Sequence, residues 1–257
     1  MTGSDSSAQC ETYEVVNAAG RGGALILCEH ASHHIPPRYK GLGLAEGDCQ
    51  SHAAWDPGAR AVSLALSAAL DAPLVASRVS RLVYDLNRPL DAASAIPAKS
   101  EVYDIPGNSG LSAEERAARH ARWHDPFHAA LAQVLDGRRG GAFVTVHSFT
   151  PVYNGARREV EIGYLHDAGD RLARAALAAE EARGRYRSAL NEPYAASDGV
   201  TYTLRKHGEA RGLPSLMIEV RNDLIDTEDK ARAMAGHLYG TLAAALTADL
   251  TEGGGTR

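Results

Sequence analysis

The sequence predicts a single α/β domain, built on a mostly parallel, mixed and twisted sheet with helices on both faces. Short apolar runs alternate along the chain with longer runs that carry apolar residues at helical spacing. The 257 residues show no internal repeat and no break in composition, and 44% of them are hydrophobic, which is enough for one sizeable core. Because crossover helices cover both faces of a parallel sheet, this order of elements favours one domain over residues 1–257. We expect a loose polar arm at residues 1–20 and a flexible tail at residues 251–257.

The first half of the chain begins with an apolar run that follows glycines, and residues 24–28 predict a buried strand. Asp56 is placed to cap a helix with Pro57 at its first position, and residues 59–70 then have apolar side chains at helical spacing. Two more short runs are typical of strands, at 74–76 and 82–84.

The second half begins with a capping box, the sequence SAEE that starts at Ser112. The helix that it opens could extend to Asp136. Apolar runs predict strands at 142–146, 160–165 and 215–220, and helical spacing predicts helices at 168–182 and 227–250.

Composition excludes several classes of protein. A net charge of −5 with dispersed Lys and Arg argues against nucleic acid or an anionic membrane as the main partner. No apolar run approaches the roughly 18 residues that span a bilayer. The first residues lack the basic and apolar stretches of a signal peptide, so we expect a cytoplasmic protein. The three cysteines lack CxxC spacing, which indicates neither a disulfide framework nor a cysteine-zinc module.

Polar side chains at the ends of predicted strands mark the candidate site, because sites in open α/β sheets form beyond the carboxyl ends of strands. His30, His33 and His34 directly follow the first strand, and His147 ends the strand at 142–146. Each could be structural, with its imidazole bonded to a nearby carbonyl. The alternative is that His30 and His147 point into one cleft and bind a metal, since neutral imidazole suits zinc.

A catalytic zinc usually has three protein ligands and one position for water. Asp56 lies on the same side of the sheet as His30, and we prefer it as the third ligand, although it could be a plain helix cap. His33 is the competing candidate.

Glu219 interrupts the apolar strand at 215–220, where a carboxylate is costly to bury unless it is paired or functional. Arg221 could neutralise it as a structural pair. The functional interpretation makes Glu219 a general base for zinc-bound water.

The segment SRLVYDLNRP concentrates arginines near Asp85 and Asn87. Arginine binds carboxylates with two parallel hydrogen bonds, so Arg81 and Arg88 beside a metal would suit a small acidic substrate. The simpler alternative is a surface turn in which Asp85 pairs with Arg88.

These segments together resemble a known family. The motifs VTVHSF, LVYDLNRP and MIEVR resemble the zinc carboxypeptidase and aspartoacylase-like superfamily. Within it, CEHASHHIPP, HAAWDPGA, SRLVYDLNRP, NEPYAASDGVTYTLRKHGEARGLP and IEVRNDLI resemble the N-formylglutamate amidohydrolase family, over roughly residues 23 to 245. The resemblance implies a zinc-carboxypeptidase-like fold.

The resemblance also implies residue roles. His30 and His147 match the superfamily's two zinc-binding histidines, and Glu219 matches its catalytic glutamate. The position of the usual ligand glutamate, three residues after the first histidine, is His33 here, so Asp56 is our replacement ligand. The remaining correspondences are Arg81, which would polarise the scissile carbonyl, Asn87 and Arg88, which would hold the substrate carboxylate, and His207, which would help to orient substrate or base.

The implied function is zinc-dependent hydrolysis of the amide of an N-acyl amino acid, with N-formyl-L-glutamate giving formate and L-glutamate. One zinc ion per chain is expected, and another divalent metal could replace it. Two alternatives remain open: an amidohydrolase or small carboxypeptidase for another acyl group, and a metal-free binding protein for an acidic small molecule.

Overall fold

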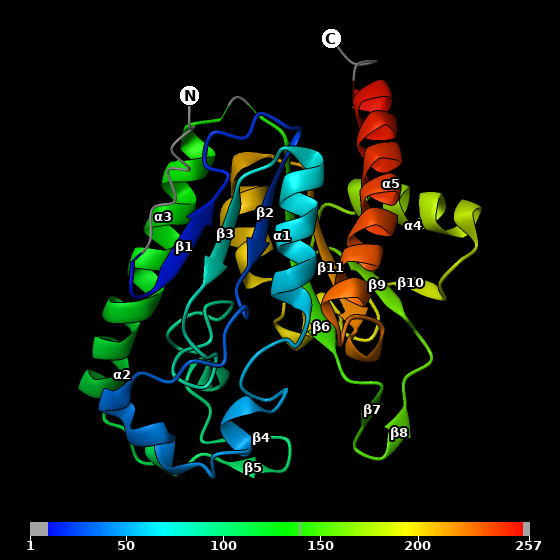
Figure 1. Cartoon of the computed structure of the whole chain (residues 1–257). Coiled ribbons are helices and arrows are strands. Elements are labelled where there is room, and N and C mark those ends of the chain that lie inside the picture. Colours follow the sequence, from blue (N-terminus) through cyan, green and yellow to red (C-terminus); the bar gives the residue numbers. More distant parts are fainter. Residues whose placement is uncertain (1–9, 139, 254–257) are drawn as a thin grey trace, which may run out of the picture.

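A mixed sheet lies at the centre of the structure, with seven strands in the order β1-β3-β2-β6-β11-β9-β10. The computed structural model describes residues 10–138 and 140–253 (Figure 1). The strands of this sheet are β1 (Tyr13–Val16), β2 (Ala24–Cys28), β3 (Leu74–Ser77), β6 (Ala142–Phe149), β9 (Ile162–Leu165), β10 (Ser188–Leu190) and β11 (Ser215–Arg221). Strands β3, β2, β6 and β11 run parallel, whereas β1 is antiparallel to β3 and β9 is antiparallel to β11. The predicted mixed sheet with a parallel centre is confirmed.

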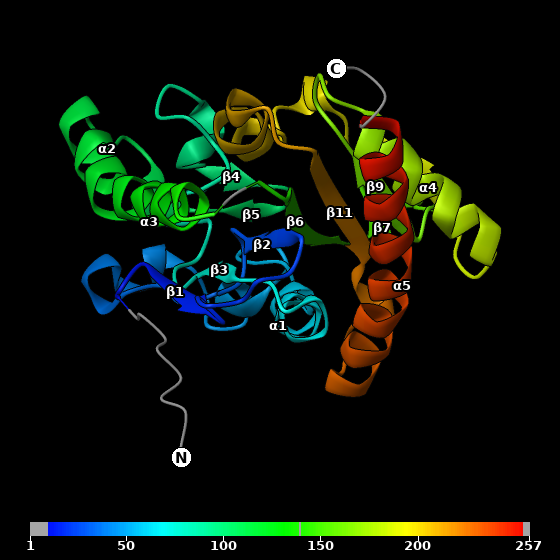
Figure 2. The same ribbon diagram turned by 90° about the horizontal axis from the view of Figure 1, so that it is seen from above.

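Helices cover both faces of this sheet, as the sequence predicts. Their bounds are α1 (Ala59–Leu70), α2 (Ala113–Arg119), α3 (Asp125–Asp136), α4 (Arg171–Arg183) and α5 (Glu228–Gly253). One apolar core joins α1, α4 and α5 to the sheet, and a second joins α3 to the opposite face. Figure 2 shows α3 on one side of the strands and α1 on the other.

Alternation along the central strands decides which face the polar residues occupy. In β6, Val144 and Val146 belong to the core under α1, whereas Phe143 belongs to the core under α3. Because side chains alternate between faces, His147 lies on the same face as Phe143. The same rule places Glu219 of β11 on the face of Met217, under α3.

Two small hairpins extend from the end of the molecule at which the parallel strands finish. They are β4 (Lys99–Ser100) with β5 (Tyr103–Asp104), and β7 (Val152–Tyr153) with β8 (Ala156–Arg157). Both lie at the lower end in Figure 1. The sequence analysis does not predict either hairpin.

The long helical run from Ser112 is confirmed. Ser112 Oγ accepts a hydrogen bond from the Glu115 amide, and the Glu115 carboxylate accepts one from the Ser112 amide, which completes the predicted capping box. Helices α2 and α3 are joined by a π-helical turn at His120–His124, so the run reaches Asp136 without a break.

The predicted strand at 82–84 is wrong. These residues form a turn and the coil after it, because the Leu82 amide binds Ser80 Oγ and the Val83 amide binds the Ser80 carbonyl. Their apolar side chains are nevertheless buried in the core under α3. The apolar run therefore reflects burial, which a short turn can provide as well as a strand.

The expected loose arm is also corrected in part, since Tyr13–Val16 pairs with β3 as the edge strand β1. Residues 1–9 of that arm, and residues 254–257 of the expected tail, lie outside the described residues. Over the described part of the chain, no helix is both long and apolar enough to cross a membrane.

A buried carboxylate ties α4 and α5 to the sheet. Glu180 of α4 is fully buried, and its oxygens lie 2.7 Å from His237 Nε2. The same carboxylate accepts hydrogen bonds from Tyr164 of β9 at 3.1 Å and from Thr241 of α5 at 3.0 Å. This cluster supplies the polar link in an otherwise apolar contact between helix and helix.

A chain of hydrogen bonds supports the loop that carries Asp85 and Asn87. His128 of α3 donates through Nε2 to the Leu86 carbonyl at 2.9 Å, because a carbonyl can only accept. His128 Nδ1 is then the acceptor for His207 Nε2 at 2.7 Å, and Arg211 approaches His207 Nδ1 at 3.3 Å. The direction of these bonds requires both imidazoles to be neutral. Consistently, burial lowers the pKa of His128 well below its usual value and lowers that of His207 to about 4.

Replacing Glu180 by alanine should lower the free energy of unfolding by about 3–5 kcal/mol, because the buried polar groups that bind this carboxylate lose their partner. Urea unfolding monitored by circular dichroism measures this loss. Glu181→Ala is the matched control, since the neighbouring Glu181 is exposed. A loss of the same size in both variants would contradict the structural role of Glu180.

The free energy of unfolding should fall as the pH drops from about 6.5 towards 4. Over this range His128 and His207 bind protons in the unfolded chain but stay neutral in the folded one, because their pKa values are lowered there. His128→Gln keeps a donor for the Leu86 carbonyl but cannot titrate. From pH 7 to pH 5 the free energy of unfolding should decrease in both chains. The decrease in this variant should be smaller than that in the parent by on the order of 1–2 kcal/mol. The exposed His33→Gln serves as control, and equal losses in parent and His128→Gln would refute the assignment.

Candidate active site

A cavity of about 230 Å³ lies at the carboxyl ends of the central strands. His147 and Glu219 line it from β6 and β11, and His30 lines it from the loop that follows β2. Glu101 and Tyr153 line it from the two small hairpins. This is where open α/β sheets form their sites. A larger hollow of about 690 Å³, bordered by Arg21 and Arg138, has no histidine, aspartate or glutamate in its lining.

The register of the parallel strands places His147 next to Glu219. In the parallel ladder between β6 and β11, His147 is the direct partner of Glu219. Strand β2 pairs with β6 on its other side, and His30 follows β2 by two residues. The prediction that His30 and His147 point into one cleft from adjacent strands is confirmed.

Asp56 is held by backbone contacts rather than by a capping role. Its amide donates to the His30 carbonyl at 3.0 Å. Helix α1 begins only at Ala59, after Gly58, which has a φ of 82°. A Cβ at Gly58 would lie 2.3 Å from the Ile225 carbonyl oxygen, so the turn requires glycine. The predicted N-cap is therefore wrong, because this turn directs the Asp56 carboxylate away from the helix.

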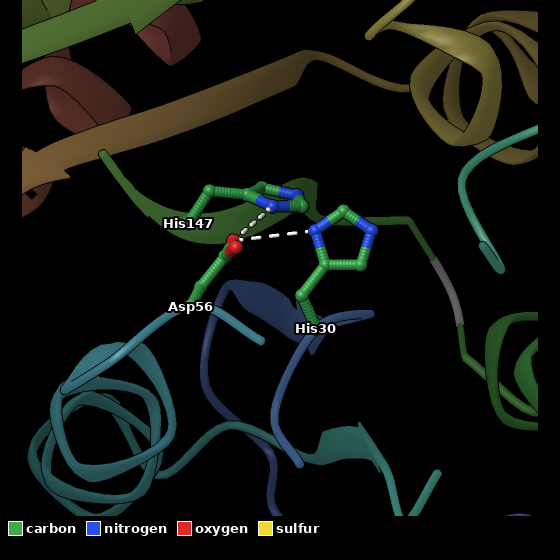
Figure 3. Close-up of side chains that lie close together, drawn as sticks. All are labelled: His30, Asp56 and His147. Carbon is green, nitrogen blue, oxygen red and sulfur yellow. Dashed lines mark hydrogen bonds and ion pairs between the residues drawn. The ribbon is translucent and has the colours of Figure 1, made fainter. Parts of the chain in front are cut away.

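The Asp56 carboxylate instead lies between two histidines (Figure 3). Its Oδ2 atom is 3.2 Å from His30 Nδ1 and 2.8 Å from His147 Nδ1. All three side chains are buried. The competing ligand His33 is exposed and packs on Trp55, with ring centroids 5.0 Å apart, so it does not join the cluster.

A second carboxylate lies behind each histidine. His30 Nε2 donates to Asp85 Oδ1 at 2.8 Å, and His147 Nε2 is 3.1 Å from Glu29 Oε2. Such partners fix the ring orientation and leave Nδ1 to face the centre, as is usual for metal-binding histidines. The alternative pairing of Asp85 with Arg88 is not observed, because Asp85 binds His30 and Arg81.

Arg81 is the cation that contacts the buried carboxylates of Asp56 and Asp85. Its guanidinium lies 3.0 Å from Asp85 and 3.4 Å from Asp56, and 29% of its side chain is exposed towards solvent. Arg81 therefore stands at the boundary between the buried carboxylates and the cavity.

Glu219 is buried, and no described residue makes a hydrogen bond with its Oε2 atom. Arg221, considered above as its neutralising partner, binds Glu161 and Asp223 instead. Burial raises the pKa of Glu219 to about 7, which is suitable for a group that accepts and returns a proton near neutral pH.

The residues fit a metal ion. Ligands at 2.0–2.1 Å from a tetrahedral zinc are about 3.3 Å apart. The Asp56 oxygen lies 3.2 Å and 2.8 Å from the two imidazole nitrogens, and all three donors lie within 4.8 Å of one another. The wider cluster holds four buried carboxylates, and within it Arg81 is the permanently charged cation, so a divalent ion would offset the excess negative charge. Among the described residues, Glu29 Oε1 and Glu219 Oε2 are buried without a hydrogen-bond partner, and the 3.1 Å contact between His147 Nε2 and Glu29 Oε2 is an ion pair without hydrogen-bond geometry.

The predicted substrate-binding residues do not all reach the cavity. Arg88 lines it, with its guanidinium held by Ser94 Oγ and the Asn87 carbonyl. Asn87 also lines it, but its side chain binds the Val200 carbonyl and accepts two hydrogen bonds from Thr203. Asn87 thus joins two loops, and a direct bond from it to substrate stays a prediction.

His207 is not among the residues that line the cavity. Its place is in the hydrogen-bond chain through His128 to the Leu86 carbonyl, from which it supports the loop that carries Asn87 and Arg88. Its role in orienting substrate or base stays a prediction.

Sequence reasoning missed several residues that build the site. The sequence analysis assigns neither Glu29 nor Asp85 a role behind the histidines, although Glu29 directly precedes His30. His52 and Glu101 form a pair at 2.9 Å on the cavity wall, joining two loops, and no sequence pattern indicates it.

Comparison with known proteins gives the same picture. No curated protein matches the chain. The gene product Atu2144 from Agrobacterium tumefaciens is 48% identical in sequence, with 94% of this chain and 97% of that chain covered and a TM-score of 0.92. An N-formylglutamate amidohydrolase from Ralstonia eutropha JMP134 is 18% identical, with 94% and 100% covered and a TM-score of 0.68, which shows a shared fold.

The family model of N-formylglutamate amidohydrolase matches residues 23–226. This range covers most of the chain and contains the clustered His30, Asp56 and His147 together with Glu219. The chain therefore belongs to the N-formylglutamate amidohydrolase family.

Proposed function

We propose that this protein hydrolyses the amide bond of an N-acyl amino acid, with N-formyl-L-glutamate as substrate and formate and L-glutamate as products. The observation that carries the proposal is the position of Glu219. It is a buried carboxylate with an unpartnered oxygen, next to His147 in the sheet and at the wall of the cavity. Family membership supports the same reaction.

His30, Asp56 and His147 are the residues that would hold the metal, zinc or another divalent ion. When bound there, zinc would polarise the scissile carbonyl and lower the pKa of a water molecule. Asp85 and Glu29 keep the two imidazoles oriented for this task.

Glu219 moves the proton. It accepts a proton from the attacking water as the oxygen bonds to the acyl carbon, and it then donates that proton to the leaving nitrogen as the amide C–N bond breaks. Arg81 stabilises the negative charge that develops on the carbonyl oxygen, since two carboxylates hold it at the cavity boundary.

Arg88 binds the substrate carboxylate and so positions the acyl carbon. Asn87 and His207 contribute indirectly, because they hold the loop on which Arg88 lies. The aromatic residues Phe149, Tyr153 and Tyr194 form another part of the wall. The acyl specificity depends on this wall, and the relative turnover of formyl-, acetyl- and succinyl-glutamate distinguishes the proposed substrate from other N-acyl amino acids.

His147→Ala and Asp56→Ala should each lose the zinc bound at this centre, because each removes one of three ligands. Elemental analysis of purified protein measures the metal content, and His33→Ala is the control, since His33 is an exposed histidine outside the cluster. Full zinc retention in both ligand variants would overturn the assignment of this centre.

Glu219→Gln should lower kcat by roughly 10²- to 10⁴-fold, because glutamine cannot accept the proton of water. Formate release from N-formyl-L-glutamate measures the loss. Zinc content should equal that of the parent chain, since Glu219 is not a proposed ligand. Near-full activity in this variant would show that another group is the base.

A further inference from the structure

A second group of side chains that could bind a metal lies where α2 and α3 join, in the helical run that Figure 1 shows in green. It consists of His120, His124 and Asp125, which we call the π-turn cluster. None of the three residues lines the cavity of the candidate active site. The cluster therefore needs an explanation of its own.

The π-helical turn is what brings the three side chains together. The Asp125 amide donates to the His120 carbonyl, which is the five-residue hydrogen bond of a π-helix. Because this turn is wider than an α-helical one, positions four and five residues after His120 both lie near it. The rings of His120 and His124 stack with centroids 4.1 Å apart, and Tyr84 packs edge-on against both.

The three donor atoms lie within 4.8 Å of one another, with the Asp125 carboxylate close to both imidazoles. Asp125 Oδ1 is 3.2 Å from His120 Nδ1 and 3.1 Å from His124 Nδ1. These separations approach the spacing of about 3.3 Å between ligands of a tetrahedral zinc at 2.0–2.1 Å. The donor set, two imidazole nitrogens and one carboxylate oxygen, is the same as that of His30, Asp56 and His147.

The cluster has the surroundings of a ligand site. His124 is buried, and its other ring nitrogen lies 3.0 Å from the Tyr202 hydroxyl, which fixes the ring. His120 and Asp125 have side-chain exposures of 22% and 56%, so an ion can reach the donors from solvent.

We propose that the π-turn cluster is a second metal site, in which His120, His124 and Asp125 bind a divalent transition-metal ion such as Zn²⁺ or Ni²⁺. Imidazole donors favour these ions over Mg²⁺ and Ca²⁺. Water fills the remaining positions of the ion. The site is independent of the proposed hydrolysis, because its residues are separate from the catalytic ones.

Equilibrium dialysis against Zn²⁺ at pH 7, with metal counted by elemental analysis, tests the proposal. The parent chain should bind two equivalents. Asp125→Asn and His120→Ala should each weaken the second equivalent by roughly tenfold or more, since each removes one ligand. Both substitutions are at partly exposed positions, so the fold should survive, and circular dichroism checks this.

Two comparisons complete the design. His147→Ala should lose one equivalent and keep the one at the π-turn cluster, and His34→Ala, an exposed histidine outside both groups, should keep both. Asp125→Asn should also keep the amide hydrolysis of the parent. The proposal is overturned if the parent binds no zinc beyond what His147→Ala loses, or if folded Asp125→Asn and His120→Ala bind two equivalents as tightly as the parent.

Discussion

The parallel pairing of β6 with β11 is the constraint on which the site depends. It places His147 directly beside Glu219, on the same face of the sheet. Both strands are buried along their whole central part, so a shift of register would turn these polar side chains into an apolar core. The geometry of the proposed base and of one proposed ligand is thus fixed by the most strongly buried part of the fold.

Buried negative charge organises what surrounds that pair. Glu29, Asp56, Asp85 and Glu219 lie together near two histidines, and Arg81 contacts two of the four carboxylates. An arrangement with this excess of carboxylates is unfavourable in a low-dielectric interior unless a cation or protons offset it. This arrangement suits the metal ion that we propose for its centre.

Residues from distant parts of the chain support the loop that carries Asn87 and Arg88. Asn87 binds Val200 and Thr203. His128 of α3 donates to the Leu86 carbonyl, and His207 of the π-helical turn at Leu204–Gly208 binds His128 in turn. These contacts explain how a residue such as His207 can belong to the family pattern without reaching the cavity. Its side chain acts on the position of the loop.

The sequence by itself determined the buried central strands, the main helices and the candidates His30, His147 and Glu219, because apolar runs mark strands and polar residues at their ends stand out against them. Only the tertiary structure decided that Asp56 rather than His33 joins the histidines, that Glu29 and Asp85 lie behind them, and that residues 82–84 form a turn. These outcomes depend on contacts between residues far apart in the chain. Local periodicity carries no information about such contacts, since it reports burial and not the partner that provides it.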